Sequence, residues 1–223
     1  AHGSLAERIP APPGYDRGPA AAGSFAAWLR GLPLREPGTI VRLFDGRQKT
    51  RQDAAFAVVD IDVGDRDLQQ CADAVIRLRA EYLRQAGREE RIAFAFTSGH
   101  PARWPDWRLG RRPVVEGNDV SWAHRTAPDS SYWAFRDYLN AVFTYAGSAS
   151  LARELTAIAD PSRVRPGDVF IRGGFPGHAV LVADVAENTA GERVFLLVQS
   201  YMPAQDIHVL TNPGAPGSAW YPA

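Results

Sequence analysis

Cysteine is nearly absent from this chain of 223 residues, in which Cys71 is the single example. One cysteine excludes an intramolecular disulfide bond and any zinc site built from several thiolates. Long hydrophobic runs are missing as well. Apolar stretches such as residues 194–198 have the length of a strand, whereas a membrane-spanning helix needs roughly 18 apolar residues. The sequence therefore predicts no transmembrane segment.

The chain also lacks an excess of charge of either sign. It carries 25 Lys and Arg residues against 25 Asp and Glu residues, and Lys49 is its only lysine. Without a positive field there is little to hold a polyanion, so we expect no nucleic-acid partner. Hydrophobic residues at 45% and charged residues at 22% are close to globular averages, so most of the chain is expected to fold. We expect a monomer.

Composition along the chain indicates one domain with an N-terminal extension. Residues 1–23 are rich in Pro, Gly and Ala, which is typical of an extended arm rather than of core. Residues 24–223 are predicted to form a single α+β domain. Within it, residues 98–160 are predicted to be an insertion of loop and helices.

Hydrophobic periodicity predicts four helices. The clearest covers residues 67–85, with Asp65 or Asp67 as its cap and Gly87 as its stop. The others are expected at residues 25–32, which Ser24 caps and Pro33 ends, and at 131–145 and 148–158. Residues 98–118 should be irregular loop.

Strands are expected mainly in the last third of the chain. A polar turn separates residues 178–185 from 193–199, so these two runs are predicted to pair antiparallel. The runs 39–44 and 55–61 are interpreted as a hairpin with a long loop. Further strands are predicted at residues 169–171 and 206–210. Helices that come first and antiparallel strands that follow define an α+β fold.

Cys71 and His178 are the candidate catalytic pair. Cys71 lies about one turn inside the 67–85 helix, where backbone N–H groups stabilise a thiolate. A lone cysteine there is also commonly a small buried hydrophobic residue. His178 opens a strand after a Pro-Gly loop, which suits a general base or a half-buried structural histidine. Gln199, at the end of the next strand, is predicted to orient the imidazole. Asp73 would place a negative charge near the thiol and oppose a thiolate.

Two segments carry a resemblance to known enzymes. Residues 166–171 (Pro-Gly-Asp-Val-Phe-Ile) and 177–182 (Gly-His-Ala-Val-Leu-Val) resemble the catalytic-histidine segment of papain-like bacterial cell-wall hydrolases of the NlpC and CHAP types. Gln70-Cys71 is similar to the Gln-Cys motif of the CHAP type. The resemblance implies a papain-like core, with the cysteine helix packed on an antiparallel sheet. It also implies a cysteine peptidase or amidase that acts on peptide or peptidoglycan bonds without a metal or organic cofactor.

The chain resembles another family over much of its length. Residues 60–64, 66–75, 167–171 and 199–205 are similar to a family of bacterial proteins, mostly exported, that is catalogued as domain of unknown function 4846. This resemblance implies a periplasmic or cell-envelope-associated protein. The first residue is Ala1 rather than methionine, which fits either a removed signal peptide or residues left by cloning.

Aromatic and arginine side chains form a candidate binding surface. Trp104, Trp107, Trp122 and Arg108 would line a groove for a sugar or peptide, or they would simply cover the core. These residues support a second hypothesis, in which the same fold is a non-catalytic module that binds cell-wall glycan or peptide.

Two further residues are candidates for the wall of a substrate pocket. Ser200 and Tyr201 directly follow Gln199, and so would border the proposed catalytic pair. A Cys71 thiol buried in apolar core, away from His178, would favour the binding module over the enzyme.

Overall fold

The computed structural model describes residues 2–223, and their contacts divide the chain into two compact units. The first unit comprises the chain up to Val75 together with Ala157–Phe170 and Ala179–Ala223. The second comprises Ile76–Thr156 and Ile171–His178. It includes most of the stretch 98–160 that the sequence indicated as an insertion, but it begins earlier.

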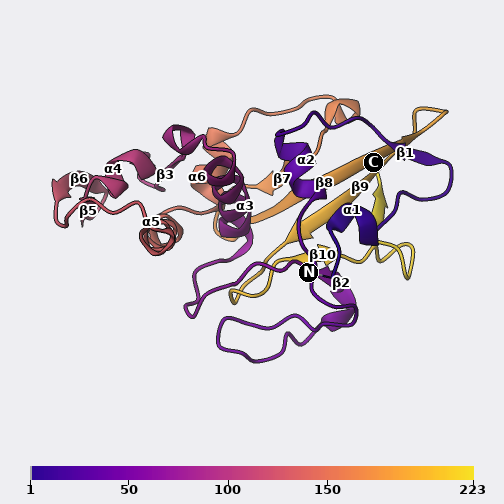
Figure 1. The fold of residues 1–223 in the computed structure, drawn as a ribbon, viewed down its shortest axis with the longest axis horizontal. Helices are drawn as coiled ribbons and strands as arrows, with labels where there is room; N and C mark the ends of the chain where they lie inside the picture. Colours follow the sequence, from indigo (N-terminus) through magenta and orange to yellow (C-terminus); the bar gives the residue numbers. More distant parts are fainter. Residues whose placement is uncertain (1) are drawn as a thin grey trace. The chain divides into compact units, whose positions relative to one another are not determined.

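An antiparallel sheet dominates the first unit, and it confirms the predicted α+β class. The long strands β8 and β9 run side by side at its centre (Figure 1), and the order along the sheet is β1-β8-β9-β10-β2, with β11 also paired to β9 and β7 to β8. The seven strands are β1 (Tyr15–Arg17), β2 (Ala55–Val58), β7 (Val169–Arg172), β8 (His178–Asn188), β9 (Arg193–Gln199), β10 (His208–Leu210) and β11 (Trp220–Pro222).

Alternating apolar residues hold this sheet to its core. Val182, Val185 and Phe195 form a buried cluster with Val164, which lies in the segment before β7. The register pairs Val182 with Leu197 and then shifts by one residue before Asp184, where β8 carries a bulge. The predicted antiparallel pairing of β8 with β9 is confirmed.

The N-terminal segment is not the extended arm that its composition suggested. Ser4 caps the short helix α1 (Leu5–Arg8), and the side chain of Leu5 is fully buried. Strand β1 pairs antiparallel with the far end of β8. A further helix, α2 (Phe25–Arg30), begins where predicted, because the Ser24 hydroxyl accepts the N–H of Ala27.

The hairpin expected at residues 39–61 does not form. Residues 39–44 make only isolated bridges, among them Leu43 with Gln205. Strand β2, preceded by the 3₁₀ turn η1 (Gln52–Ala54), pairs with β10 instead. A polar loop between two apolar runs is therefore not enough to predict a hairpin, because either run can pair with a strand that is distant in sequence, as β2 does with β10.

Helix α3 (Cys71–Gln85) begins four residues later than predicted and ends where predicted. At its start the Asp73 carboxylate accepts the N–H of Gln70 (3.0 Å), which makes Gln70 the residue flanking the helix. At its end Gly87 takes a positive φ of 66°, and the N–H of Arg88 reaches the carbonyl of Leu83 (2.8 Å). These bonds form a glycine-terminated helix end.

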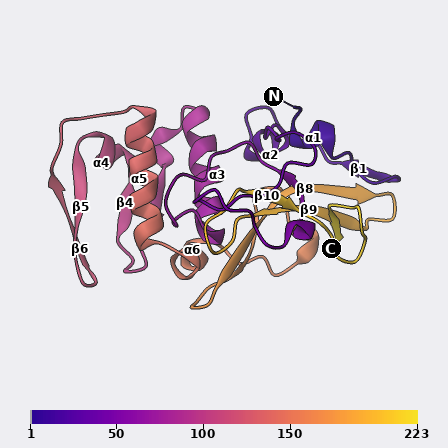
Figure 2. The same ribbon diagram turned by 90° about the horizontal axis from the view of Figure 1, so that it is seen from below.

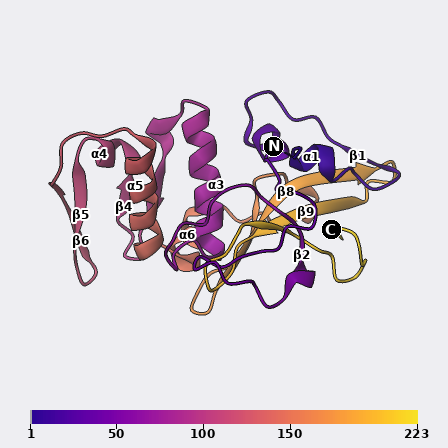
Figure 3. The same cartoon turned by 60° about the horizontal axis from the view of Figure 1, so that its bottom comes forward.

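The second unit is built on helices, with α5 lying beside α3 in both Figure 2 and Figure 3. The helix predicted at residues 131–145 is confirmed as α5, and Ser131 caps it. The predicted loop at 98–118 is wrong, because it holds strands and a helix. The elements of this unit after α3 are η2 (Glu89–Arg91), β3 (Ala93–Ala95), β4 (Pro101–Arg103), α4 (Trp104–Arg108), β5 (Arg111–Glu116), β6 (Asp119–His124), α5 (Tyr132–Tyr145) and α6 (Ser148–Glu154).

No helix within residues 2–223 has both the length and the apolar character required to cross a membrane.

A last 3₁₀ turn, η3 (Pro161–Arg163), precedes strand β7.

Candidate functional site

Cys71 is the first residue of α3. The first helical hydrogen bond runs from the N–H of Ala74 to the carbonyl of Gln70 (2.9 Å), so the N–H groups before Ala74 precede the helical ladder. The Cys71 side chain is free and half-buried. The thiol therefore lies at the positive end of a fifteen-residue helix, one turn nearer to it than the sequence indicated.

Asp73 corrects an expectation about the charge near this thiol. One of its carboxylate oxygens accepts the N–H of Gln70, and the other has no hydrogen-bond partner among residues 2–223. Burial raises the pKa of Asp73 to about 8. The carboxyl group therefore keeps its proton at neutral pH, and the expected negative charge beside Cys71 is largely absent.

The connection between β9 and β10 is bonded to the residues that precede Cys71. The buried Ser200 hydroxyl lies 2.9 Å from the Gln69 carbonyl and 2.8 Å from the Gln205 carbonyl. The Asp67 carboxylate accepts the N–H of Ala204 (2.7 Å). Ser200 is thus a buried structural hydroxyl rather than part of a pocket wall, and it fixes the chain immediately before the cysteine helix.

Tyr201, the next residue, is exposed on the surface of the first unit. Its ring lies 5.4 Å from the Lys49 ammonium, within the range of a cation–π interaction. Tyr201 is the one member of the predicted Ser200–Tyr201 pair that a ligand can reach.

His208 is a buried histidine to which the sequence assigned no role. It pairs directly with Gln199 across β10 and β9, and its Nδ1 lies 2.9 Å from the carbonyl of Asp206. Burial lowers the pKa of His208 to about 4, so the ring is neutral at physiological pH. With Nδ1–H donated to the carbonyl, Nε2 carries a lone pair, and that atom has no hydrogen-bond partner in the described chain.

His178 begins β8, as predicted from its place after the Pro-Gly loop. Alternation along a strand gives His178 the face of Val182 and gives Gln199 the face of Leu197. Cys71 belongs to the first unit and His178 is the last residue of the second, so their pairing stays a prediction.

The aromatic candidates lie in the second unit. Trp104 and Trp107 are 0% and 6% exposed and pack on Tyr138, so neither offers a free ring face to a ligand. Trp122 is half-buried and stacks on Phe96, at 6.3 Å between ring centroids. Trp104 and Trp107 are therefore core residues, which was the alternative to a binding groove.

Arg108, the fourth candidate for this surface, pairs with acidic side chains of its own unit. Its guanidinium lies 3.2 Å from Glu89 and also bonds Glu90. Arg108 can therefore bind a ligand only if its ion pairs with these two glutamates break.

Sequence reasoning overlooked His208 and the buried amide oxygen of Gln205, which has no hydrogen-bond partner in the part of the chain that the structure describes. Both follow Gln199 within ten residues, but their burial depends on the strand order β9-β10-β2. The one available signal was the dense polar run from Gln199 to His208 beside an apolar strand. Within residues 2–223 no group of three or more His, Cys, Asp or Glu side chains is arranged to hold a metal ion.

The geometry defines an α+β protein with an antiparallel sheet and a cysteine at a helix start. A family model described as domain of unknown function (4846) matches residues 5–223, and the chain belongs to this family. No curated protein and no solved structure shows a significant match. The comparisons thus support the family resemblance and do not support the resemblance to papain-like hydrolases.

Proposed function

We propose that the protein is a cysteine hydrolase that cleaves peptide or amide bonds. The observation that carries this proposal is the placement of Cys71, half-buried at the first position of α3 beside a carboxyl group that stays protonated. A core cysteine would be fully buried among apolar side chains, whereas this one is half-buried and lies at the first position of a helix.

The proposed chemistry uses three residues. His178 accepts the thiol proton, and the Cys71 sulfur attacks the substrate carbonyl carbon to form a tetrahedral oxyanion, which the N–H groups at the start of α3 stabilise. The carbon–nitrogen bond then breaks, and the amine leaves with the proton that His178 held. Water, deprotonated by His178, releases the acid from the thioester and restores the thiol. Gln199, the last residue of β9, is proposed to hold the imidazole.

The substrate class follows from the resemblance to cell-wall hydrolases. We propose peptide bonds of the bacterial envelope, including those of peptidoglycan, and an exported protein with a papain-like core. The alternative, a module that binds glycan on an aromatic surface, is weakened by the burial of Trp104 and Trp107.

Alkylation tests the nucleophile directly, because Cys71 is the only thiol in the chain. We expect iodoacetamide at pH 7 to modify it faster than N-acetylcysteine, since both the helix start and a nearby base favour the thiolate. His178→Ala should slow the reaction, and His124→Ala, on an exposed strand end of the second unit, should not. A rate no faster than that of the small thiol would refute an activated cysteine.

Activity on isolated peptidoglycan and on envelope peptides tests the function. Release of new amines should require both Cys71 and His178. Gln199→Ala should lower the rate about ten- to a hundredfold, while the loss of one hydrogen bond costs only about 1 kcal/mol of stability. Unchanged turnover in Cys71→Ala would end the proposal. A Gln199→Ala variant that loses stability but keeps its rate would assign Gln199 a structural role.

A further inference from the structure

A cavity of about 520 Å³ lies within the first unit, away from the proposed catalytic residues. It is formed by the α2 segment, the turn before β7, and the paired ends of β8 and β9. Val185 in its wall is seven residues from His178 along β8, which is roughly 20 Å at about 3.3 Å per residue. The volume falls in the range typical of small-molecule sites, about 300–1,000 Å³.

One wall of this cavity is apolar and depends on a glycine. Phe25 lines the cavity and packs directly on Gly167, where a Cβ would lie 2.7 Å from the ring. Gly167 also adopts a positive φ of 99°. Pro166 and Val185 extend the same wall. The Pro-Gly-Asp turn noted in the sequence thus shapes the cavity.

Two of the three arginines that line the cavity are already engaged by the protein. Arg30 donates to the buried Asp184 carboxylate (2.9 Å) and to the Gly18 carbonyl (2.8 Å). Arg193 lies 3.4 Å from Glu187 and donates to main-chain carbonyls of the preceding turn. These bonds hold both guanidinium groups in fixed positions at the cavity wall.

Arg165 is the arginine without a counter-charge. Its backbone N–H binds the Asp168 carboxylate (2.7 Å), but its guanidinium has no hydrogen bond or ion pair within the described residues. Moreover, the Asp184 carboxylate forms ion pairs with both Arg30 and Arg17, so one negative charge is shared by two positive charges. The cavity therefore combines apolar walls with a surplus of positive charge.

We propose that this cavity binds a small organic carboxylate with an apolar body. The guanidinium of Arg165 provides a planar fork for the carboxylate oxygens, and the wall around Phe25 receives the apolar part. Arg165 is exposed, so water weakens its electrostatic attraction to an anion unless the ligand itself covers the guanidinium. That requirement favours a ligand that brings its own apolar surface over a bare inorganic anion.

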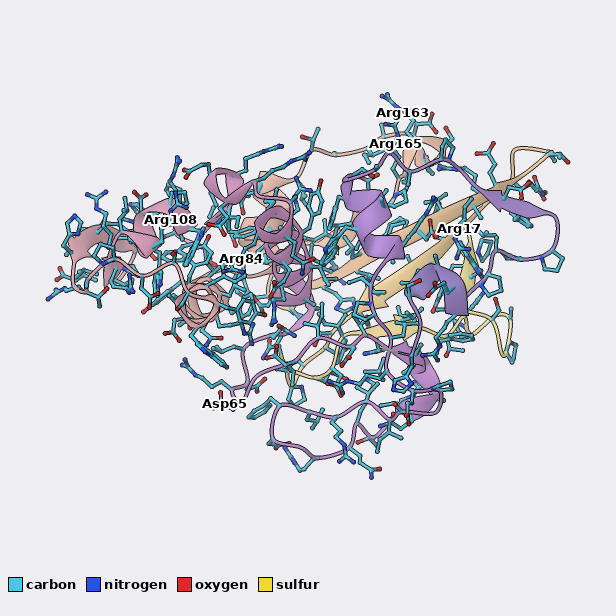
Figure 4. The ribbon with its side chains drawn as sticks, in the orientation of Figure 1. Arg17, Asp65, Arg84, Arg108, Arg163 and Arg165 are labelled. Carbon is cyan, nitrogen blue, oxygen red and sulfur yellow. The ribbon has the colours of Figure 1, made fainter. Side chains whose placement is uncertain are left out.

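The chain supplies a matched control for this proposal. Arg163 and Arg165 are both exposed and lie two residues apart on the same segment (Figure 4), but only Arg165 lines the cavity. The two arginines contribute equally to the net charge of the protein. A difference between their variants therefore reports the cavity rather than the general electrostatic field.

Isothermal titration of the full chain with octanoate, 1-octanol and inorganic phosphate tests the proposal. We expect saturable one-to-one binding of octanoate, and binding of octanol and phosphate at least tenfold weaker. Arg165→Gln should weaken octanoate binding at least tenfold, and Arg163→Gln less than twofold. Ala26→Trp places a large side chain in the cavity from α2 and should abolish octanoate binding. Arg165→Gln changes an exposed side chain, so this variant should keep its fold.

Three results would overturn the proposal: no saturable octanoate binding, equal losses in Arg163→Gln and Arg165→Gln, or octanol binding as tight as octanoate. Phosphate binding tighter than octanoate would instead assign the cavity to inorganic anions and would equally reject it. None of these outcomes depends on Cys71, so the result is independent of the proposed hydrolase.

Discussion

The two ends of helix α3 bury carboxyl groups in opposite ways. Asp73, in the first unit, and Glu81, in the second, are both 6% exposed. Glu81 accepts hydrogen bonds from Arg77 Nε (2.8 Å) and from the Tyr132 hydroxyl (2.7 Å). Asp73 accepts a hydrogen bond from the N–H of Gln70 alone among residues 2–223. Equal burial therefore leaves one carboxyl group paired with an arginine within its own unit, and the other with a raised pKa two residues after the only thiol.

This difference separates a structural role from a chemical one. A buried ion pair with full hydrogen bonding holds helices together, and its charges are not available to a substrate. A buried carboxyl group with a free oxygen and a raised pKa is unfavourable for stability, and such groups are common at functional sites. The contrast on one helix supports the candidate site at the start of α3.

The largest expected effect is at Asp73. The folded state holds a proton between pH 4 and 8 that the unfolded state has released, so this group lowers the free energy of unfolding as pH rises, until about pH 8. Asp73→Asn should remove this loss, on the order of 5 kcal/mol across that range. Urea unfolding of both proteins from pH 4 to 9 measures it.

The exposed Asp65, labelled in Figure 4, gives the control for this measurement. Asp65→Asn should follow the wild-type curve at every pH. If Asp73→Asn did the same, Asp73 would be ionised in the folded state and the contrast with Glu81 would disappear.

The next largest effect is at the paired carboxylate. Glu81→Leu removes the carboxylate of a buried ion pair with Arg77 and should lower the free energy of unfolding by about 3–5 kcal/mol. The double variant Arg77→Met/Glu81→Leu should recover most of this loss, because no unpaired charge remains. Substituting the exposed pair Arg51 and Asp53 should have no measurable effect. A double variant as unstable as the single one would mean that packing, not charge, explains Glu81.

A smaller effect of opposite sign is expected at His208. Its pKa is lowered from 6.5 to about 4, so the unfolded state takes up a proton first as pH falls. The free energy of unfolding should therefore drop by about 3 kcal/mol between pH 7 and 4. His208→Asn should flatten this acid limb, since its amide can still donate to the Asp206 carbonyl. His124→Asn, at an exposed position, should keep the limb unchanged; a similar flattening there would assign the acid limb to the overall charge.

Local signals in the sequence predicted the helices well where capping residues are present. Ser24, Ser131 and Gly87 mark helix ends in the structure because their bonds involve residues within five positions. The 98–118 segment was mispredicted as loop although β4 and β5 pair with near neighbours, β3 and β6, because β4 has only three residues and β5 begins with Arg-Arg-Pro, so neither shows a clear apolar alternation. The N-terminal arm was mispredicted for a different reason, since β1 is stabilised by β8, more than 160 residues away.

The candidate site was only partly predictable. Cys71 at a helix start, and His178 and Gln199 on strands, follow from periodicity and turn residues. Asp73 was predicted to be negatively charged, whereas burial raises its pKa to about 8. A position in the sequence does not reveal burial. His208 and the cavity around Arg165 depend on which strands are neighbours, and the strand order is not written in any local pattern.

By itself the sequence determined the α+β class, the absence of intramolecular disulfide bonds, and the helix ends marked by Ser24, Ser131 and Gly87, because each of these depends on composition or on contacts between near neighbours in the chain. Only the tertiary structure decided which polar groups are buried, which of them are paired, and where the protein contains a cavity. Those properties arise from strands and helices that meet across long sequence separations. The desolvation that raises the pKa of Asp73 and lowers that of His208 exists only once that packing is complete.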